Sequence, residues 1–289
     1  MKNTIFSYIQ LTKPSIMLLV MFTGATALVL EGSFLSQPGR FILVMIGLYL
    51  TGGSANALNQ YFEREIDAKM TRTYKRRPLP LGKLTSTGAL TFSAGIGLAG
   101  VLIFAVFFNW LTALLSLGTI LFYSLFYTLW LKPNTDQNIV IGGIAGAMAP
   151  VGAWTAATGT MDIVPWILFA IVFLWTPPHF WALALYHKDD YVRAKLPMMP
   201  VVRGDRATLK QIMAYTSVLF GVSLSLLLFG GGWIYLVAAL VLGGLFIRKV
   251  IAAFRSPSTT VLRGVFGYSI LYLFGLFTAI IVDGLLRNA

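Results

Sequence analysis

The fold is decided by residues 41–67, FILVMIGLYLTGGSANALNQYFEREID. Residues 41–61 carry no charge and are long enough to cross the hydrocarbon core of a bilayer as one helix. Asn59, Glu63 and Asp67 recur every four residues, which on a helix places them on one face, roughly 6 Å apart. Carboxylates at a membrane edge are costly and usually functional. The stretch therefore predicts a membrane-spanning helix that ends in a stripe of oxygen ligands for a metal ion.

Cations follow this stripe in two short runs, Met70-Thr-Arg72-Thr73 and Arg76-Arg77-Pro78-Leu-Pro80. Guanidinium groups bind phosphate oxygens, and Mg²⁺ bridges carboxylate and phosphate oxygens. Carboxylates beside arginine and lysine therefore suit a substrate that carries a diphosphate. An apolar cavity among the helices would hold the rest of that substrate, which makes a polyprenyl diphosphate the natural candidate.

The composition excludes an ordinary soluble domain. Of the 289 residues, 57% are hydrophobic and 11% are charged, and the mean hydropathy is +0.78. Nine apolar stretches have membrane-spanning length. They predict an all-α, polytopic membrane bundle with spans near residues 15–30, 41–61, 88–108, 110–131, 138–158, 163–185, 213–230, 233–247 and 265–283.

The basic residues are distributed by membrane side and not gathered for nucleic acid. The formal charge is +12, and all 22 lysines and arginines except Arg40 and Arg287 fall on one side if nine spans follow a cytoplasmic N-terminus. This positive-inside pattern predicts contact with membrane lipid and no nucleic-acid partner. No transit peptide or lipidation motif is evident, so a bacterial inner (plasma) membrane is the default location. The chain has no cysteine, which excludes disulfides and thiolate metal ligands.

The two longest polar connections, about 63–87 and 186–212, both fall on the predicted cytoplasmic face. Each begins with acidic residues, continues with basic ones and carries paired prolines. This similarity suggests an internal repeat, as in membrane proteins built from duplicated halves. We therefore expect one integral-membrane domain over residues 1–289, made of two degenerate halves, with its chemistry where the two loops meet.

Several motifs together resemble the UbiA-type intramembrane prenyltransferases. The resemblance begins at Thr12-Lys13-Pro14 and weakens after about residue 212. Within the superfamily, the second loop and the Pro-Pro-His segment are most similar to the branch that farnesylates haem. The motifs that carry the resemblance are Asn59-x3-Glu63-x3-Asp67, Met70-x-Arg72-Thr73, Pro177-Pro-His-Phe-Trp181, and Asp190-Tyr191 leading to Pro197-x2-Pro200-Val-Val-x-Gly204.

The resemblance implies nine helices around a central cavity, an active site that faces the cytoplasm, and two acidic motifs that bind Mg²⁺ and diphosphate. Family members commonly have aspartate at the position of Glu63, and Glu63 keeps the oxygen ligands on a longer arm. Where relatives place spaced aspartates in the second motif, this chain has His179 and the Asp189-Asp190 pair. The implied metal ligands are Asn59, Glu63, Asp67, Asp189 and Asp190, and the implied catalytic residues are Asn59, Glu63, Asp67, Arg72 and Asp190.

The implied reaction transfers a farnesyl group from farnesyl diphosphate to a vinyl group of haem B. Water captures the cation that the transfer leaves beside the porphyrin. The products are diphosphate and haem O, and haem O serves the biogenesis of haem-copper oxidases. The implied partners are farnesyl diphosphate, haem B, lipid, and haem A synthase or terminal-oxidase assembly proteins. The residues expected to bind the two substrates are His179, His187, Arg76, Arg77, Lys132, Lys188 and Arg193.

Each candidate also has a purely structural explanation. The carboxylates of the first motif could pair with nearby cations where a helix emerges into water. Arg72, Arg76 and Arg77 could set topology or bind anionic lipid, and Lys132 could snorkel to the interface. His179 could make a structural hydrogen bond, and Asp189 could pair with Lys188. The aromatic residues that could stack on a porphyrin or shield a cation could equally be packing: Tyr123, Tyr127, Trp175 and Trp181.

Three other functions are compatible with parts of the pattern. A UbiA-type enzyme with an aromatic, quinone-precursor acceptor would keep the first motif but should show spaced aspartates in the second. A transporter could use Gly52-Gly53 or Pro177-Pro178 as helix breaks. A noncatalytic haem-binding assembly factor could use His179 but has no need of the acidic stripe.

Overall fold

The computed structural model describes the backbone of residues 2–288 and the side chains of residues 4–71 and 73–286. All regular secondary structure in the described part is helical. Nine of the described helical segments are long and apolar enough to cross a membrane, which confirms the nine predicted spans. In chain order they are Pro14–Glu31, Pro38–Phe62, Ser86–Phe107, Trp110–Asn134, Asn138–Thr158, Ile163–Tyr186, Asp205–Phe229, Trp233–Arg255 and Thr259–Leu286.

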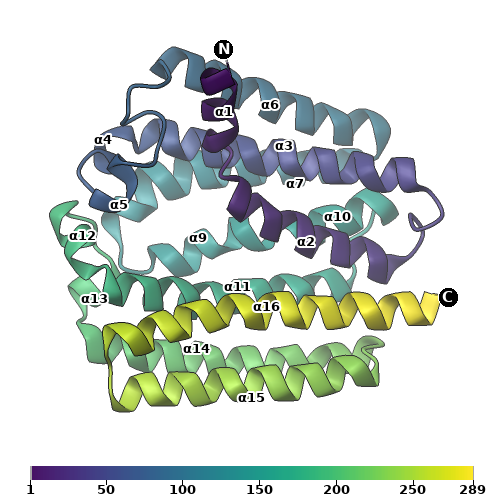
Figure 1. Cartoon of the computed structure of the whole chain (residues 1–289). Helices are drawn as coiled ribbons and strands as arrows, with labels where there is room; N and C mark the ends of the chain where they lie inside the picture. Colours follow the sequence, from purple (N-terminus) through teal and green to yellow (C-terminus); the bar gives the residue numbers. More distant parts are fainter. Residues whose placement is uncertain (1, 289) are drawn as a thin grey trace.

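Five of these spans are single helices by the labels of Figure 1: α2 (Pro14–Glu31), α3 (Pro38–Phe62), α6 (Ser86–Phe107), α11 (Ile163–Tyr186) and α15 (Trp233–Arg255). The last span belongs to α16 (Thr259–Asn288). Each of the other three spans is made of consecutive helical segments. The fourth span consists of α7 (Trp110–Leu121), the π-helix η1 (Phe122–Leu131) and α8 (Lys132–Asn134), and the fifth of α9 (Asn138–Ala147) and α10 (Ala149–Thr158). The seventh consists of α14 (Asp205–Ser225) and the 3₁₀-helix η2 (Leu226–Phe229).

The helix starts follow ordinary local chemistry. Pro14 and Pro38 open α2 and α3, where a missing N–H costs nothing. Thr85 caps α6 by accepting from the backbone N–H of Gly88, and Asn109 caps α7 in the same way. Between such ends the apolar sequence forms helices, because a helix satisfies every backbone polar group without water.

The helices form three neighbouring groups in Figure 1. α3 packs on α6 and α7, while α11, α14, α15 and α16 pack on one another. Between these groups lie α2, α9 and α10, of which α2 contacts α10 and α16, and α9 contacts α11. The short polar segments α4, α5, α12 and α13 all lie at the same end of the bundle, so the two loops do meet at one end.

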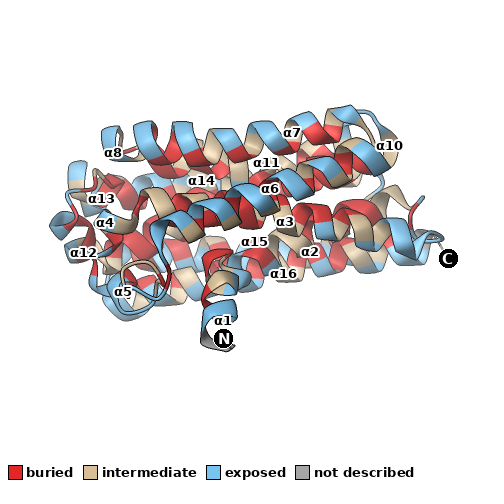
Figure 2. Cartoon of the chain, turned by 90° about the horizontal axis from the view of Figure 1, so that it is seen from above, coloured by how far each residue is buried: buried red, intermediate tan, exposed pale blue. Residues whose placement is uncertain are grey.

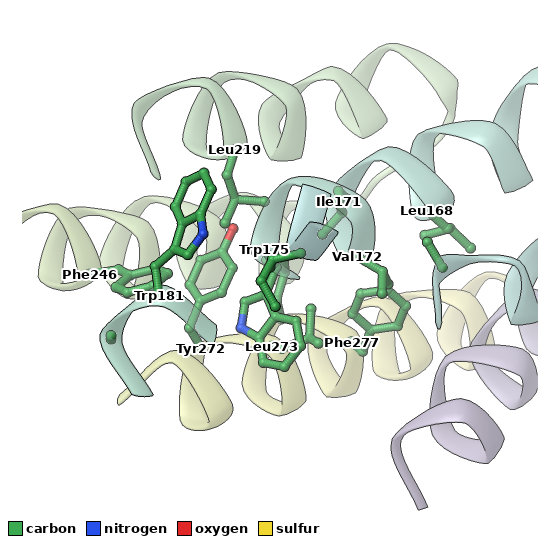
Figure 3. Packing of buried hydrophobic residues seen from close by; sticks show 14 of the residues in the cluster. Leu168, Ile171, Val172, Trp175, Trp181, Leu219, Phe246, Tyr272, Leu273 and Phe277 are labelled. Carbon is green, nitrogen blue, oxygen red and sulfur yellow. The ribbon is translucent and has the colours of Figure 1, made fainter. Parts of the chain in front are cut away.

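Burial divides most of the long helices into an inner and an outer face (Figure 2). The outer faces carry large apolar side chains, such as Leu98, Leu228 and Trp233, with 62%, 82% and 75% of their surface exposed. Such a surface suits lipid contact and not water. The most buried span is α11, in which 72% of the most apolar 18-residue stretch lies inside the bundle. Its Trp175 and Trp181 pack against side chains of neighbouring helices (Figure 3).

The polar connections are more helical than the sequence suggested. Residues 63–87 contain α4 (Arg64–Asp67) and α5 (Thr71–Tyr74), and residues 186–212 contain α12 (Lys188–Arg193) and α13 (Met199–Val202). The predicted loop end at 212 was wrong, because α14 already begins at Asp205, after Gly204 with φ of 81°. Helices α15 and α16 likewise extend past their apolar parts, because helical hydrogen bonds continue into the aqueous interface. A further helix, α1 (Lys2–Leu11), precedes the first span.

The suggested breaks for a transporter are continuous helix. Pro177 and Pro178 lie inside α11, and Gly52 and Gly53 lie inside α3. A Cβ at Gly52 would come within 2.8 Å of Cε of Met17, so this glycine allows α2 to approach α3 closely. The break that does occur falls at Met148, between α9 and α10.

Candidate active site

A cavity of about 790 Å³ is lined in part by residues of both loops. Its mouth is polar and is lined by the first motif and by lysine and arginine side chains. Its interior is apolar and aromatic and runs between α2, α3, α7, η1, α9, α10, α11 and α16. The volume lies in the range of cavities that enclose a small organic ligand. The shape suits a molecule with one charged end and a long apolar body.

The predicted acidic stripe exists. Asn59 lies in the last turn of α3, Glu63 ends that helix, and Asp67 closes α4; each is only 2% exposed. The backbone N–H of Glu63 donates to the carbonyl of Asn59, and that of Asp67 donates to the carbonyl of Glu63. Helical spacing therefore continues across the junction, which keeps all three side chains on the cavity side.

Three cations hold this stripe. Lys132 forms an ion pair with Glu63, and Arg77 forms one with Asp67. Nη1 of Arg77 also lies 3.6 Å from Oε2 of Glu63, so it bridges the two carboxylates. Buried charges persist when they are paired in this way.

Lys13 is the third cation, and it was not among the residues predicted to form the site. Its Nζ donates to Oδ1 of Asn59 over 2.8 Å. Lys13 lies between α1 and α2 with φ of 53°, a conformation that residues other than glycine seldom adopt. The turn is held because the N–H groups of Ile16 and Met17 both donate to the Lys13 carbonyl. The one signal in the sequence was a lysine directly before the proline that opens the first span.

Burial and neighbouring charges set the pKa values at the cavity mouth. Burial alone would raise the pKa of Glu63, but Lys132, Arg77 and Lys13 together hold it below its usual value. Burial raises the pKa of Asp67, and Arg77 offsets only part of that effect. Burial, aided by the charge of Arg77, lowers the pKa of Lys13 to about 7. The charge on Lys13 is therefore labile near neutral pH.

The π-helix η1 supplies one wall of the cavity. Its Tyr123 and Tyr127 both line the cavity and stack with ring centroids 5.1 Å apart. Thr128 donates its hydroxyl to the carbonyl of Tyr123 and accepts from the side-chain amide of Asn59, which links η1 to the acidic stripe. A Cβ on Gly142 would lie 2.7 Å from Cδ2 of Tyr127, so this glycine makes room for the ring. π-Helical segments are rare and occur frequently at functional sites.

His179 lines the same cavity from α11. It is 8% exposed, and its ring stacks on Trp175 and Phe266 with centroid distances of 4.3 and 4.4 Å. Its Nδ1 lies 2.7 Å from Oγ of Ser269 on α16. A predicted substrate-binding histidine is thus held rigidly at the cavity wall.

The second loop contributes less to the cavity than the resemblance implied. Asp190 is buried and pairs with Arg193, which also donates to Oγ1 of Thr71 and so joins the two loops. Asp189 is exposed, and Nζ of Lys188 pairs with Asp205 at 2.7 Å. His187 packs on the ring of Tyr186 at the end of α11. The side chains of the described residues that line the cavity do not include Asp189, Asp190, His187, Lys188 or Arg193.

The structure brings most of the remaining predicted residues to one cavity: Asn59, Glu63, Asp67, Arg76, Arg77, Lys132 and His179. The side chain of Arg72 lies outside the described residues. Beyond the predictions, Lys13 lines the mouth, while Thr128 and Ser269 orient residues that line the cavity.

Comparison with known proteins gives the family. A model of the UbiA prenyltransferase family matches residues 18–280. This chain belongs to the UbiA prenyltransferase family. Curated relatives include protoheme IX farnesyltransferases from Alkalilimnicola ehrlichii, 46% identical over 96% of this chain and 91% of the relative, and from Symbiobacterium thermophilum, 46% identical over 96% and 93%. The family and the nine apolar helices make this UbiA-family chain a multi-pass membrane protein.

Solved structures have the same UbiA fold. A digeranylgeranylglyceryl phosphate synthase superposes with a TM-score of 0.80 at 19% identity, over 98% of this chain and 99% of that one. A UbiA homologue from Archaeoglobus fulgidus bound to GPP and Mg²⁺ superposes with a TM-score of 0.61 at 16% identity, over 95% and 99%. These likenesses confirm the predicted fold of this UbiA-family member.

The donor set at the mouth of this UbiA-family cavity fits Mg²⁺ only with help from a ligand. Among the residues whose side chains are described, no three histidine, aspartate or glutamate side chains cluster into a metal cage. Two carboxylates and one amide oxygen do come together, from Glu63, Asp67 and Asn59. Mg²⁺ commonly binds one or two carboxylates and completes its shell with water and substrate phosphate. The residues therefore suit a magnesium ion that arrives with a diphosphate.

Proposed function

We propose that the protein transfers a farnesyl group from farnesyl diphosphate to a vinyl group of haem B, with addition of water, to give haem O and diphosphate. The observation that carries the proposal is a single cavity whose mouth clusters carboxylates and cations and whose interior is apolar and aromatic. The proposal is supported by relatives named protoheme IX farnesyltransferase that are 46% identical over nearly the full chain.

The diphosphate binds at the cavity mouth. Lys13, Arg77 and Lys132 surround the acidic stripe there, and Arg76 also lines the cavity. We include Arg72 among the diphosphate-binding cations because it belongs to the Met70-x-Arg72-Thr73 motif. Asn59, Glu63 and Asp67 would hold Mg²⁺, which supplies positive charge to the leaving diphosphate. The cations that now pair with the carboxylates would turn towards the phosphate oxygens, where charge-assisted hydrogen bonds are strong.

The chemistry breaks the bond between C1 of the farnesyl chain and the diphosphate oxygen, and the diphosphate keeps the electron pair. The terminal carbon of the vinyl group forms a new bond to C1. The cation left beside the porphyrin is captured by water, which then loses a proton. Tyr123 and Tyr127 line the cavity and present electron-rich rings that shield the electron-poor C1. The stacked rings also keep bulk water away from the allylic centre.

The haem lies against the wall formed by α11 and α16. His179 is the polar group of that wall, and Trp175 and Phe266 are flat surfaces on either side of it. Asp190 and Arg193 act in the proposal by joining the two loops. His187, Lys188 and Asp189 remain predictions of the resemblance, because their side chains lie beyond the cavity wall.

The proposal extends to cellular context. The whole chain acts as one domain of two degenerate halves in a bacterial plasma membrane, with the cavity mouth facing the cytoplasm. The concentration of basic residues at the mouth end favours this orientation. Haem O would then serve haem-copper oxidase biogenesis, with haem A synthase and terminal-oxidase assembly proteins as partners.

The test is a mass-spectrometric assay of the purified full chain in detergent, supplied with haem B, Mg²⁺ and farnesyl diphosphate. We expect haem O, and we expect EDTA to abolish it. Prenylation of an aromatic acid in place of haem would contradict the acceptor and leave the family intact. Haem binding without transfer, in protein that also binds farnesyl diphosphate, would favour an assembly factor.

A further inference from the structure

Ser269 on α16 is hydrogen-bonded to the polar side chains of the wall against which we place the haem. It is fully buried, and two side chains of α11 converge on it. Nε1 of Trp175 donates to the Ser269 carbonyl over 2.6 Å, and Nδ1 of His179 lies 2.7 Å from the Ser269 hydroxyl. The Ser269 hydroxyl in turn donates to the carbonyl of Phe266 over 2.6 Å. These bonds tie α11 to α16 at the depth of the cavity wall.

The direction of these bonds fixes the tautomer of His179. A serine hydroxyl has one hydrogen, and at Ser269 that hydrogen is directed to the Phe266 carbonyl. With the hydroxyl bonded to Phe266 in this way, Oγ accepts from His179, which places the proton on Nδ1. The other described neighbours of the imidazole are the rings of Trp175, Phe180 and Phe266, none of which compensates a buried charge. The ring is thus neutral, and Nε2 has a free lone pair.

The ring cannot easily turn to present another atom. It is stacked between Trp175 and Phe266, with interplanar angles of 20° and 25°. No side chain or backbone group in the described part of the chain is hydrogen-bonded to Nε2, and His179 lines the cavity. Nε2 therefore stays available to a ligand in the cavity.

We propose that Ser269 is a positioning residue that holds His179 in the Nδ1–H tautomer, so that Nε2 ligates the iron of the haem acceptor. The proposal rests on the haem-farnesylating function proposed above. A hydrogen bond from the remote N–H fixes the orientation of a ligating imidazole and raises its basicity. Ser269 would thereby set where the porphyrin, and with it the vinyl group, stands in the cavity.

The experiment follows ferric haem B binding to the full chain in detergent, by absorption and electron paramagnetic resonance spectra. We expect wild type to show histidine-ligated haem, and His179→Ala to lose that signature. Ser269→Ala should weaken haem binding about 10-fold and raise the haem reduction potential, and Ser269→Thr, which keeps the hydroxyl, should restore both. Ser116→Ala is the matched control, because Ser116 also lines the cavity but lies on α7.

Two results would overturn the inference. One is a Ser269→Ala protein whose haem spectrum, affinity and potential equal those of wild type, and the other is a His179→Ala protein that keeps the histidine signature. If Ser269→Ala does not fold, Ser269→Cys gives the same test, because sulfur keeps the volume but accepts hydrogen bonds weakly. The proposed function is tested separately by the mass-spectrometric assay, in which it would fail if the wild-type protein formed no haem O.

Discussion

Binding of farnesyl diphosphate should weaken as the pH rises through 7, because of Lys13. Burial and the charges of Arg77 and Lys132 lower the pKa of this side chain to about 7 in the ligand-free protein, against an ordinary value of 10.5. Its Nζ already lies in the polar mouth of the cavity, bonded to Asn59. A bound diphosphate adds negative charge there and draws the pKa back up. Binding is therefore accompanied by proton uptake whenever Lys13 starts neutral.

The size of the effect follows from the populations. With a pKa of about 7, roughly ten in eleven Lys13 side chains are charged at pH 6 and roughly one in eleven at pH 8. Only the charged form pairs with the diphosphate. The dissociation constant should therefore rise about tenfold between these pH values.

The assay is calorimetric titration with an unreactive farnesyl thiodiphosphate, in wild type and in Lys13→Arg. An arginine at this position stays charged throughout the range, so this variant reports every other titration, including that of the ligand itself. The ratio of the two dissociation constants, wild type over variant, should grow about tenfold from pH 6 to pH 8. A ratio that stays constant would refute the reasoning.

Three further changes test the rest of the site. Asp67→Asn keeps the shape of the stripe but removes a charge, so turnover should fall by about 10²- to 10³-fold with haem binding retained; full activity would contradict the metal assignment. His179→Ala should weaken haem binding, measured by titration, more than farnesyl diphosphate binding, and the opposite order would reassign the residue. Gly142→Ala should push Tyr127 aside and lower stability by about 1–3 kcal/mol in thermal unfolding. Gly146→Ala, with nothing within 4 Å of its Cβ, should have no such effect.

The nine spans were predictable because the bilayer imposes one length on every apolar stretch. The ends of the helices were not, because hydropathy reports the thickness of the membrane and a helix can continue beyond it. Asp205 shows this, since α14 begins there in polar sequence well before the apolar part. The helix α1 was not predicted, because it is too short and too polar to cross the membrane.

The acidic stripe was predictable because its three members lie on one helical path, where spacing determines the face. Its partners come from distant parts of the chain, as Lys13 does for Asn59 and Lys132 for Glu63, and spacing says nothing about them. The second loop shows the opposite case, because Asp190 has the expected residue type but pairs with Arg193, which in turn donates to Thr71. The contact between His179 and Ser269 depends on how α11 and α16 pack, which a periodic pattern does not encode.

The π-helix of residues 122–131 has a consequence for insertions and deletions. A π-helix closes each hydrogen bond over five residues instead of four, so this segment turns less per residue and takes up about one residue more than an α-helix would over the same rotation. Removing one residue from this segment would therefore restore α-helical hydrogen bonding and leave the chain beyond it facing nearly the same way. Lys132 begins directly after the segment and would stay beside Glu63, whereas the stacked rings of Tyr123 and Tyr127 inside it would turn relative to each other. A single-codon deletion within this span should therefore spare the ion pair at the cavity mouth and alter the aromatic wall instead.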